Sequence, residues 1–564
     1  MKTNERLLDT LIESGIDRAF TLPGLGITWS LPAFYDRKDS LDLVLCRSEQ
    51  VASVMAQVTG RLSGKAGVFL GQGPWVASTG QFGIIEAAFS GTPMLIITDT
   101  SDYNGYGLYG CYQSMVGGYG ALDIQAVLRP MTKYCAYATE PEDIVYGAQM
   151  AYKHANLPRK GPAALIMKTT IIREEFPEKP KTPIYPSAGY YAYTAPKPDA
   201  EAVDRLGELL DRAKNPVIVA GNGVFGSGMG SALLDLAQKS GVAIVTSYLG
   251  KGSVDESADV VCGMLGTWGH PAASRMVQKA DLVIMLGASM GPDYTRFRDP
   301  KMIRPGEQTL VQVDVDPRAA GWVYPVDLAI TGDVADVVPM LARRGLDGSK
   351  KAARMEGIRE LKAKTLYDAP GSFTAEPGRV ANSDVVKAMQ QFMGKDDMIT
   401  LDAGNSRIWF TNSLRIRHQN QLLAPGGAGG MGWGGPAAAA AKLHCPDKRV
   451  TCIAGDGGFM MTADVVATCA QHKIGAVFVI MNNCGLGMVR DNMGSKRIAC
   501  DFHEVDFAKV GEGMGAKGLT VRNPGDFGDA LREAHSHEGG PVVIDVKIDP
   551  KDSHKAASDY VELE

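Results

Sequence analysis

The sequence lacks the features of a membrane-spanning, secreted or nucleic-acid-binding protein. No run approaches 18 uninterrupted apolar residues, and the opening stretch MKTNERLLDTLIESG is amphipathic rather than signal-like. The net charge is −5 and there is no basic tract, so nucleic acid and anionic membranes are poor candidates as partners. We therefore expect a soluble protein located in the cytoplasm.

Paired cysteines are also missing. The nine cysteines are scattered along the chain, and none of them forms a C-x-x-C pair. An odd number of scattered cysteines indicates reduced thiols rather than a disulfide framework or a zinc site.

Glycine, in contrast, is abundant, with 66 residues, many of them at the ends of short apolar runs. These runs alternate with longer amphipathic or alanine-rich stretches, which is the pattern of parallel strands covered by helices. We predict an α/β protein of three doubly wound parallel-sheet domains, at 1–185, 195–345 and 376–550, with a proline-rich linker at 177–198. The predicted strands are 19–22, 41–46, 66–71, 93–98 and 163–168, then 216–221, 242–247, 281–287 and 310–316, then 398–402, 449–456, 475–482 and 541–549.

The second predicted domain contains a turn that resembles a dinucleotide-binding fingerprint. The stretch VIVAGNGVFG (217–226) places Gly221, Gly223 and Gly226 as G-x-G-x-x-G directly after a strand. An NAD site also needs an acidic residue at the end of the next strand to bind the ribose, and that strand ends in VTSYLGKG without one. Two interpretations stay open, a nucleotide site or a tight turn whose glycines allow close packing.

The third predicted domain has an aspartate in an unexpected place. In IAGDGGFMM (453–461), Asp456 follows a strand inside a glycine-rich turn, where a carboxylate would repel a phosphate. The next strand ends in Asn482 and Asn483, and the 24 residues 458–481 fit one helix and one strand, so both strand ends should reach the same sheet edge. A carboxylate and an amide oxygen suit Mg²⁺, which adds water and phosphate oxygens, and the Gly485 carbonyl is a candidate third ligand. Ordinary turn capping is the alternative.

This spacing resembles the thiamine diphosphate signature, G-D-G followed by N-N. RSEQVASVMAQVTGRLSGKAGVFLGQGP (47–74) resembles the N-terminal domain of acetolactate synthase-like enzymes, with a glutamate at the position of Glu49. GGMGWGGPAAAAAK (429–442) is similar to the segment before the diphosphate motif, and YQS (112–114) resembles the family's Phe-Gln-Glu. The domain order also resembles the pyrimidine-binding, central and diphosphate-binding domains of this superfamily, which includes pyruvate decarboxylase and pyruvate oxidase.

The resemblance implies that the chain binds thiamine diphosphate and Mg²⁺, and it assigns residues to each task. Asp456, Asn483 and the Gly485 carbonyl would bind the metal. Glu49 would hydrogen-bond N1′ of the aminopyrimidine and Met431 would keep the cofactor bent, so that these two and Gln113 form the catalytic set. The cofactor-binding residues that it implies are Glu49, Asn405, Ser406, Gly429, Met431, Gly455, Asp456, Gly457, Gly458, Asn483, Gly485 and Met488.

The resemblance also implies a homodimer or homotetramer, because Glu49 and Asp456 meet across a subunit interface in this family. Several segments depart from the family pattern. QGPW (72–75) replaces Ser-Gly-Pro-Gly, which makes Trp75 a candidate substrate contact, and the tyrosine-rich segment 101–120 is expected to line a pocket or an interface. The other candidate substrate contacts are Tyr112, Gln113, Val489 and Arg490, whose charge suits a carboxylate.

The central domain departs from acetolactate synthases as well. VIMLGASMGPDY carries Ser289 and Met290 where those enzymes usually have an arginine for FAD, which argues against FAD. ADP, which the similar oxalyl-CoA decarboxylase binds centrally, is the other nucleotide that the G-x-G-x-x-G turn could hold.

The leading hypothesis is a thiamine diphosphate enzyme that decarboxylates a 2-oxo acid and joins the fragment to an acceptor. The first alternative is a C–C lyase or decarboxylase that uses the same cofactor on a 2-hydroxyacyl-CoA, oxalyl-CoA or a diketone. An NAD-dependent dehydrogenase and a non-catalytic partner subunit are the remaining alternatives.

Overall fold

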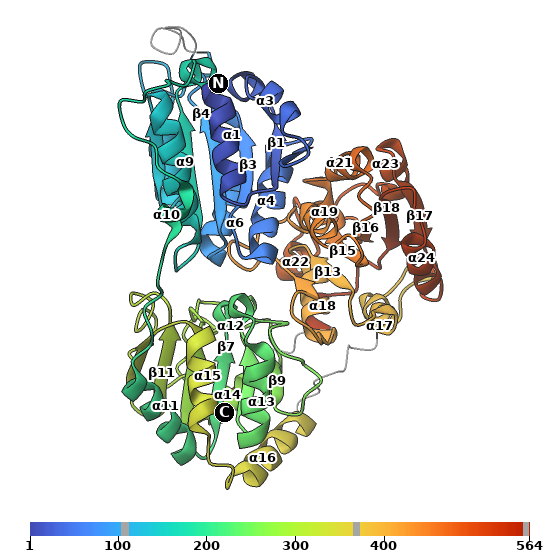
Figure 1. The fold of residues 1–564 in the computed structure, drawn as a ribbon. Helices are drawn as coiled ribbons and strands as arrows, with labels where there is room; N and C mark the ends of the chain where they lie inside the picture. Colours follow the sequence, from blue (N-terminus) through green and yellow to red (C-terminus); the bar gives the residue numbers. More distant parts are fainter. Residues whose placement is uncertain (103–111, 365–372, 557–562, 564) are drawn as a thin grey trace.

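The computed structural model describes residues 1–102, 112–364, 373–556 and 563, and these form three α/β domains (Figure 1). Each domain is built on one six-stranded sheet in which every pair of neighbouring strands is parallel. Helices cover both faces of each sheet, because its central strands are buried and apolar on both sides. The predicted fold class is confirmed. Within the described residues, none of the helices combines the length and apolar character that crossing a bilayer requires.

The N-terminal sheet has the order β2-β1-β3-β4-β6-β5. Helices α4 and α6 pack on one face, and α1 and α9 on the other. The strands are β1 (Arg18–Leu22), β2 (Asp42–Leu45), β3 (Gly67–Gly71), β4 (Met94–Asp99), β5 (Cys135–Ala138) and β6 (Pro162–Met167), and the helices are α1 (Thr3–Glu13), α2 (Leu25–Thr28), α3 (Leu31–Asp36), α4 (Glu49–Ser63), α5 (Gly73–Val76), α6 (Gln81–Ser90), α8 (Ile124–Leu128) and α9 (Pro141–Asn156). The short helix α10 (Ser187–Tyr191) interrupts the predicted linker.

The central sheet has the order β12-β11-β10-β7-β8-β9. Its faces are covered by α11, α13 and α15 on one side and by α14 and α16 on the other. The strands are β7 (Pro216–Ala220), β8 (Ala243–Thr246), β9 (Val261–Met264), β10 (Leu282–Leu286), β11 (Thr309–Asp314) and β12 (Leu328–Thr331), and the helices are α11 (Ala200–Arg212), α12 (Asn222–Ser227), α13 (Gly230–Ser240), α14 (Pro271–Lys279), α15 (Val334–Arg344) and α16 (Lys351–Lys364).

The C-terminal sheet has the order β14-β13-β15-β16-β18-β17. Helices α19, α21 and α23 pack on one face, and α17, α18 and α24 on the other. The strands are β13 (Met398–Leu401), β14 (Leu422–Leu423), β15 (Val450–Gly455), β16 (Val477–Asn482), β17 (Lys517–Val521) and β18 (Val542–Lys547), and the helices are α17 (Asn382–Phe392), α18 (Asn405–Ser413), α19 (Gly434–His444), α20 (Asp456–Met460), α21 (Val465–His472), α22 (Gly487–Met493), α23 (Phe507–Gly513) and α24 (Asp526–His535).

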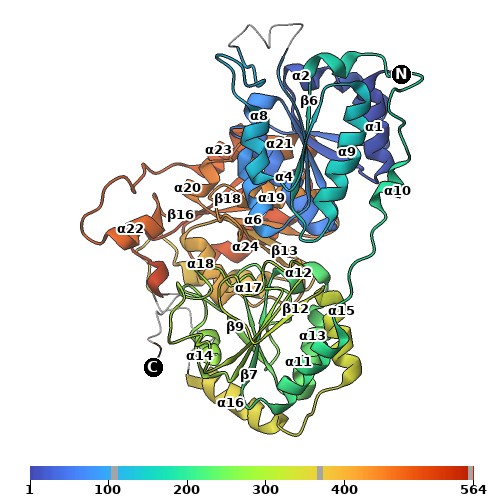
Figure 2. The same ribbon diagram turned by 90° about the vertical axis from the view of Figure 1, so that its left-hand side faces the viewer.

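The N-terminal and C-terminal domains share one hydrophobic core, because α4 packs directly against α19 (Figure 2). The alanines at 437–441 of α19 are completely buried, and their small side chains allow the two helices to approach closely. The indole N–H of Trp433 donates to Oε1 of Gln57 on α4, at 3.0 Å. This contact adds a specific polar link to the apolar interface.

Five strands were not predicted from the sequence, namely β5, β9, β12, β14 and β17. All five lie at an edge of a sheet, where a strand pairs on one side only. Most of them are short or partly exposed, so they lack the continuous apolar run that marks a central strand.

Candidate active site

The carboxyl ends of β15 and β16 bring the aspartate and the asparagines to one edge of the C-terminal sheet. The two strands are parallel neighbours, so residues that follow them lie side by side. Asp456 opens α20, and its Oδ2 accepts a hydrogen bond from the backbone N–H of Gly485 at 2.9 Å. Its Oδ1 accepts one from the backbone N–H of Gly457 at 2.8 Å. The carboxylate therefore connects the turns that follow the two strands.

Burial places the Asp456 carboxylate in an unusual electrostatic environment. The residue is only 4% exposed. Burial raises the pKa of Asp456 to about 6, although the N–H groups of Gly457 and Gly485 and the charge of Arg490 act in the opposite direction. Ionising such a carboxyl group is costly, and a bound cation would offset that cost. The position therefore fits a divalent cation.

The two asparagines after β16 have different surroundings. Asn482 is buried, and its amide donates to the carboxylate of Asp545 at 2.9 Å, so it supports the sheet. Asn483 and Asn405 both border Gly487. A Cβ atom added to Gly487 would come within 2.7 Å of Nδ2 of Asn483 and 2.6 Å of Nδ2 of Asn405, so the two amide groups lie close to each other. The missing side chain of Gly487 leaves the space in which these two amides converge.

The first turn of α18 faces the same edge, because β13 lies directly next to β15. Oδ1 of Asn405 and Oγ of Ser406 are buried and have no hydrogen-bond partner among the described residues. Buried polar atoms of this kind normally indicate a partner that completes the site, and the unpaired N–H groups of a helix start favour a phosphate. These residues fit a diphosphate group with its metal ion.

Arg490 holds the turn that carries Asn483 and Gly485. The residue is buried, and its guanidinium donates to the carbonyl groups of Asn483 at 3.2 Å and Cys484 at 2.9 Å. It also forms an ion pair with Asp501 at 2.8 Å. In this arrangement Arg490 stabilises the backbone of the candidate metal loop, which is a different role from the substrate contact predicted for it.

The loop that carries Met431 is anchored by a carboxylate that the sequence analysis did not identify. Asp402 follows β13, and its two oxygens accept from the N–H of Gly432 at 2.9 and 3.0 Å. Burial raises the pKa of Asp402 to about 6. Gly429 has a φ of 71°, which favours glycine, and Met431 is half-buried. The sequence contained a signal for Asp402, because an acidic residue ends the predicted strand 398–402. Asp456 was identified by the same kind of position, at the end of a strand.

Glu49 lies at the start of α4 in the N-terminal domain, as the sequence predicts. Ser48 caps this helix, since its Oγ accepts from the N–H of Val51 at 3.3 Å. The Glu49 side chain is buried, and its Oε2 accepts a hydrogen bond from Oγ1 of Thr79 at 3.2 Å. The carboxylate therefore has one described side-chain partner and is held on a rigid helix.

The predicted substrate contacts lie on short helices and loops. Gln113 has a left-handed backbone with a φ of 54°, and its Oε1 accepts from the amide of Gln72 at 3.1 Å. Met488, a predicted cofactor contact that precedes Val489, is half-buried on α22. The exposed side chains of this group are Trp75 on α5, Tyr112 and Val489. Residues 103–111 of the tyrosine-rich segment lie outside the described residues.

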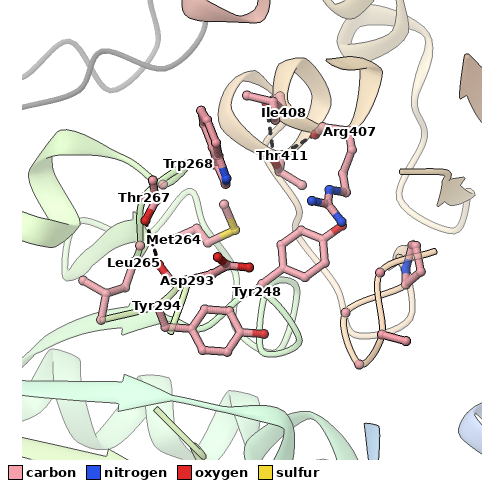
Figure 3. A pocket seen from close by; sticks show the side chains of 17 residues that line it. Tyr248, Met264, Leu265, Thr267, Trp268, Asp293, Tyr294, Arg407, Ile408 and Thr411 are labelled. Carbon is pink, nitrogen blue, oxygen red and sulfur yellow. Dashed lines mark hydrogen bonds between the residues drawn. The ribbon is translucent and has the colours of Figure 1, made fainter. Parts of the chain in front are cut away.

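A pocket of about 160 Å³ lies between the central and C-terminal domains (Figure 3). Arg407 of α18 enters it from one side, and Tyr248, Trp268 and Asp293 of the central domain line the other. The guanidinium of Arg407 lies 4.9 Å from the centre of the Tyr248 ring. Residues 425–429 complete the wall, so the pocket adjoins the loop that leads to Met431.

A second cavity, of about 240 Å³, lies at the carboxyl edge of the central sheet and includes Gly223 and Gly226. A Cβ atom on Gly221 would collide with the backbone of Gly287, and one on Gly223 would come within 2.7 Å of it. Close packing therefore explains these two glycines. Asp314, at the end of β11, also lines the cavity. The acidic residue that is absent after β8 is thus present after another strand of the same sheet.

Comparison with known proteins identifies the class to which this chain belongs. Residues 1–123, 203–341 and 402–546 match the N-terminal TPP-binding domain, the central domain and the C-terminal TPP-binding domain of thiamine pyrophosphate enzymes. The chain is therefore a thiamine diphosphate-dependent enzyme. Its relatives show that it belongs to the acetolactate synthase-like superfamily, as the sequence predicts.

These relatives align with the chain over nearly its full length. A probable acetolactate synthase large subunit from Methanocaldococcus jannaschii is 29% identical over 98% of this chain and 93% of its own length. The acetolactate synthase large subunit of Lactococcus lactis is 27% identical, with coverages of 97% and 92%. A sulfoacetaldehyde acetyltransferase from Castellaniella defragrans is 28% identical, with coverages of 95% and 90%. The comparisons favour the carboligase hypothesis over the lyase and dehydrogenase alternatives.

Proposed function

We propose that this enzyme decarboxylates a 2-oxo acid and joins the resulting fragment to a second carbonyl compound. The observation that carries the proposal is the meeting of Asp456, Asn483 and Asn405 at one sheet edge, where buried oxygen atoms are left for a metal and a diphosphate. The names of the aligned acetolactate synthases support the same reaction type.

Thiamine diphosphate, when bound, supplies a carbon nucleophile at C2 of its thiazolium ring. In our proposal Asp456, Asn483 and the Gly485 carbonyl hold Mg²⁺, which neutralises the diphosphate. The diphosphate itself is bound by Asn405, Ser406 and the N–H groups that follow Gly455, at Gly457 and Gly458.

The remaining proposed roles concern the aminopyrimidine. Gly429 and Met431 would hold its ring, and the Met431 side chain would support the cofactor. Glu49 would hold a proton at N1′ of the aminopyrimidine, which is the general acid–base role that we propose for it. Gln113, Trp75, Met488 and Val489 are the residues that we propose to contact the substrate.

We also propose that the enzyme is a homodimer or homotetramer with active sites between subunits. Glu49 and Asp456 come from different domains, and the exposed apolar side chains of Met460, Met461 and Phe502 near the GDG turn support an interface there. The cytoplasmic location stays a prediction.

The test is a panel of 2-oxo acids, aldehydes, diketones and acyl-CoA thioesters, with products identified by mass spectrometry. We expect CO₂ release and a new C–C bond from 2-oxo acids, and neither from the Asp456→Asn variant. Turnover of acyl-CoA thioesters or diketones without 2-oxo acid turnover would establish the lyase alternative instead.

A nucleotide in the central cavity is a second proposed ligand, supported by Asp314, which lines the same cavity as Gly223 and Gly226. Burial raises the pKa of Asp314, and ribose hydroxyl groups would satisfy its carboxylate. Calorimetry with ADP and with FAD tests this idea. We expect ADP to bind and Asp314→Asn to weaken it, whereas an absence of binding leaves the glycines with a packing role only.

A further inference from the structure

Glu86 is a charged residue buried between the N-terminal and C-terminal domains. It lies on α6 and is only 2% exposed. Its Oε1 accepts the backbone N–H of Gly427 at 2.8 Å, and its Oε2 accepts those of Ala428 at 2.8 Å and Gly429 at 3.3 Å. One side chain of the N-terminal domain therefore binds three consecutive N–H groups of the C-terminal domain.

Arg61 of α4 compensates this buried charge. Its Nη1 donates to the carbonyl of Ala424 at 2.9 Å, and its guanidinium lies 4.9 Å from the ring centre of Phe225 in the central domain. Burial raises the pKa of Glu86, while the three N–H groups and Arg61 counteract this effect. A buried carboxylate needs such partners, and Arg61 also connects the three domains through its contacts with Ala424 and Phe225.

The loop of residues 427–432 lies so close to α6 that only glycine fits at two of its positions. A Cβ atom on Gly427 would come within 2.7 Å of the backbone nitrogen of Ser90 and 3.0 Å of Oε1 of Glu86, and one on Gly430 would collide with the Phe82 ring. Helix α6 in turn packs against α4, and the N–H of Gly83 donates to Oγ of Ser53 at 3.1 Å. The loop therefore contacts a rigid pair of helices.

The same loop continues to Met431, and a second carboxylate holds its far side. Asp402 accepts the N–H groups of Gly432 and Gly434. We infer that Glu86 is a positioning residue that fixes Gly429 and Met431 in the conformation that binds the aminopyrimidine. Within the described part of the chain, the hydrogen bonds of its carboxylate go to backbone N–H groups of this loop. Glu86 therefore acts through the loop, and the inference rests on the proposed function of Gly429 and Met431.

The test compares Glu86→Gln with a matched control, Glu142→Gln. Glu142 is also a buried glutamate of the N-terminal domain and accepts a backbone N–H, from Lys181 at 2.9 Å, but this partner belongs to the linker. In Glu86→Gln, the new side-chain amide offers one acceptor oxygen for three N–H groups, so at least one of them loses its partner.

We expect Glu86→Gln to weaken thiamine diphosphate binding by at least about tenfold in calorimetry with Mg²⁺, the loss of one charged hydrogen bond. At saturating cofactor, exchange of the C2 hydrogen should also slow, and the near-ultraviolet circular dichroism of the bound aminopyrimidine should change. Glu142→Gln should leave all three unchanged, even where both variants lose similar thermal stability. Glu86→Asp keeps the charge but shortens the reach, and it provides a milder variant that should show the same effects to a smaller degree.

The outcomes separate this inference from the proposed function. If the wild-type protein does not bind thiamine diphosphate, the assignment of the site fails, and the inference fails with it. If the wild-type protein binds it but Glu86→Gln and Glu86→Asp match the Glu142→Gln control in affinity, exchange and dichroism, the positioning role is overturned while the proposed function stands.

Discussion

The carboxylate of Asp456 accepts the backbone N–H of Gly485 at 2.9 Å, which joins the turns after two neighbouring strands. The second oxygen is held by the N–H of Gly457. Both oxygens are therefore fixed before any ligand binds, and their orientation costs no side-chain entropy at that step. The carboxylate is preorganised for the metal role that we propose.

The Asp456→Asn variant tests this metal role. It keeps the size of the side chain but removes the charge that would attract Mg²⁺, so Mg²⁺-dependent binding of thiamine diphosphate should weaken by at least about tenfold, as for other losses of a charged contact. Isothermal calorimetry with and without Mg²⁺ measures this effect. Asp397→Asn is the control. Asp397 pairs with Arg449 at the amino ends of the strands of the same sheet, on the side away from the candidate site. Unchanged affinity in Asp456→Asn would remove the residue from the metal site.

Glu49→Gln tests proton sharing with N1′. The fold should stay intact, while exchange of the C2 hydrogen should slow by at least about tenfold, the low end of general acid–base contributions. Glu5→Gln is the matched control, because Glu5 also lies in the first turn of an N-terminal-domain helix and accepts the N–H of Lys2. If Glu49 only complements the dipole of α4, both variants will lose a little stability and exchange at the wild-type rate.

Mixing two inactive variants tests whether active sites lie between subunits. In a heterodimer of Glu49→Gln and Asp456→Asn chains, one interface site combines both substitutions and the other has neither. Equal mixing after reversible dissociation should therefore restore about a quarter of the wild-type activity, since about half of the dimers carry one intact site of two. No recovery, with heterodimers demonstrated by mass spectrometry, would place Glu49 and Asp456 in the same subunit's site.

The sequence revealed the parts of the site that are close together along the chain. Asp456 and Asn483 could be paired because each follows an apolar strand and one helix separates them. In contrast, 341 residues separate Glu86 from Gly427, so no local pattern connects this carboxylate with the N–H groups that it binds. Nothing in the sequence indicated that the Arg490 guanidinium donates to the backbone carbonyls of Asn483 and Cys484, because these contacts form only in the folded loop. The predicted substrate contact of Arg490 stays a prediction. Edge strands such as β12 were missed because partial exposure breaks their apolar run.

The Arg490→Met variant distinguishes a structural role from substrate binding. Without the guanidinium, the carbonyls of Asn483 and Cys484 lose their hydrogen-bond donor and Asp501 loses its ion-pair partner. The candidate metal loop should then become more mobile. Cofactor affinity should fall by about tenfold, as expected for a lost charged hydrogen bond. At saturating cofactor, KM for the 2-oxo acid should stay near the wild-type value. Steady-state kinetics at two cofactor concentrations measures both effects. A raised KM with unchanged cofactor affinity would support the predicted substrate contact instead.

Asp402 should make the stability of the cofactor-free protein depend on pH. Burial raises the pKa of Asp402 to about 6, although the N–H groups of Ala403, Gly432 and Gly434 lower it in part. In the unfolded chain the pKa of an aspartate is about 3.9. The folded state therefore binds the proton more tightly, so the stability contributed by the protonated group is fully present below about pH 4 and is lost as the pH rises through about 6. The two-unit shift corresponds to about 3 kcal/mol. Denaturant unfolding of the wild-type protein and of Asp402→Asn from pH 4 to 7 should show the wild-type protein losing up to that amount relative to the variant. A difference that stays constant over this range would mean that Asp402 remains ionised in the folded protein.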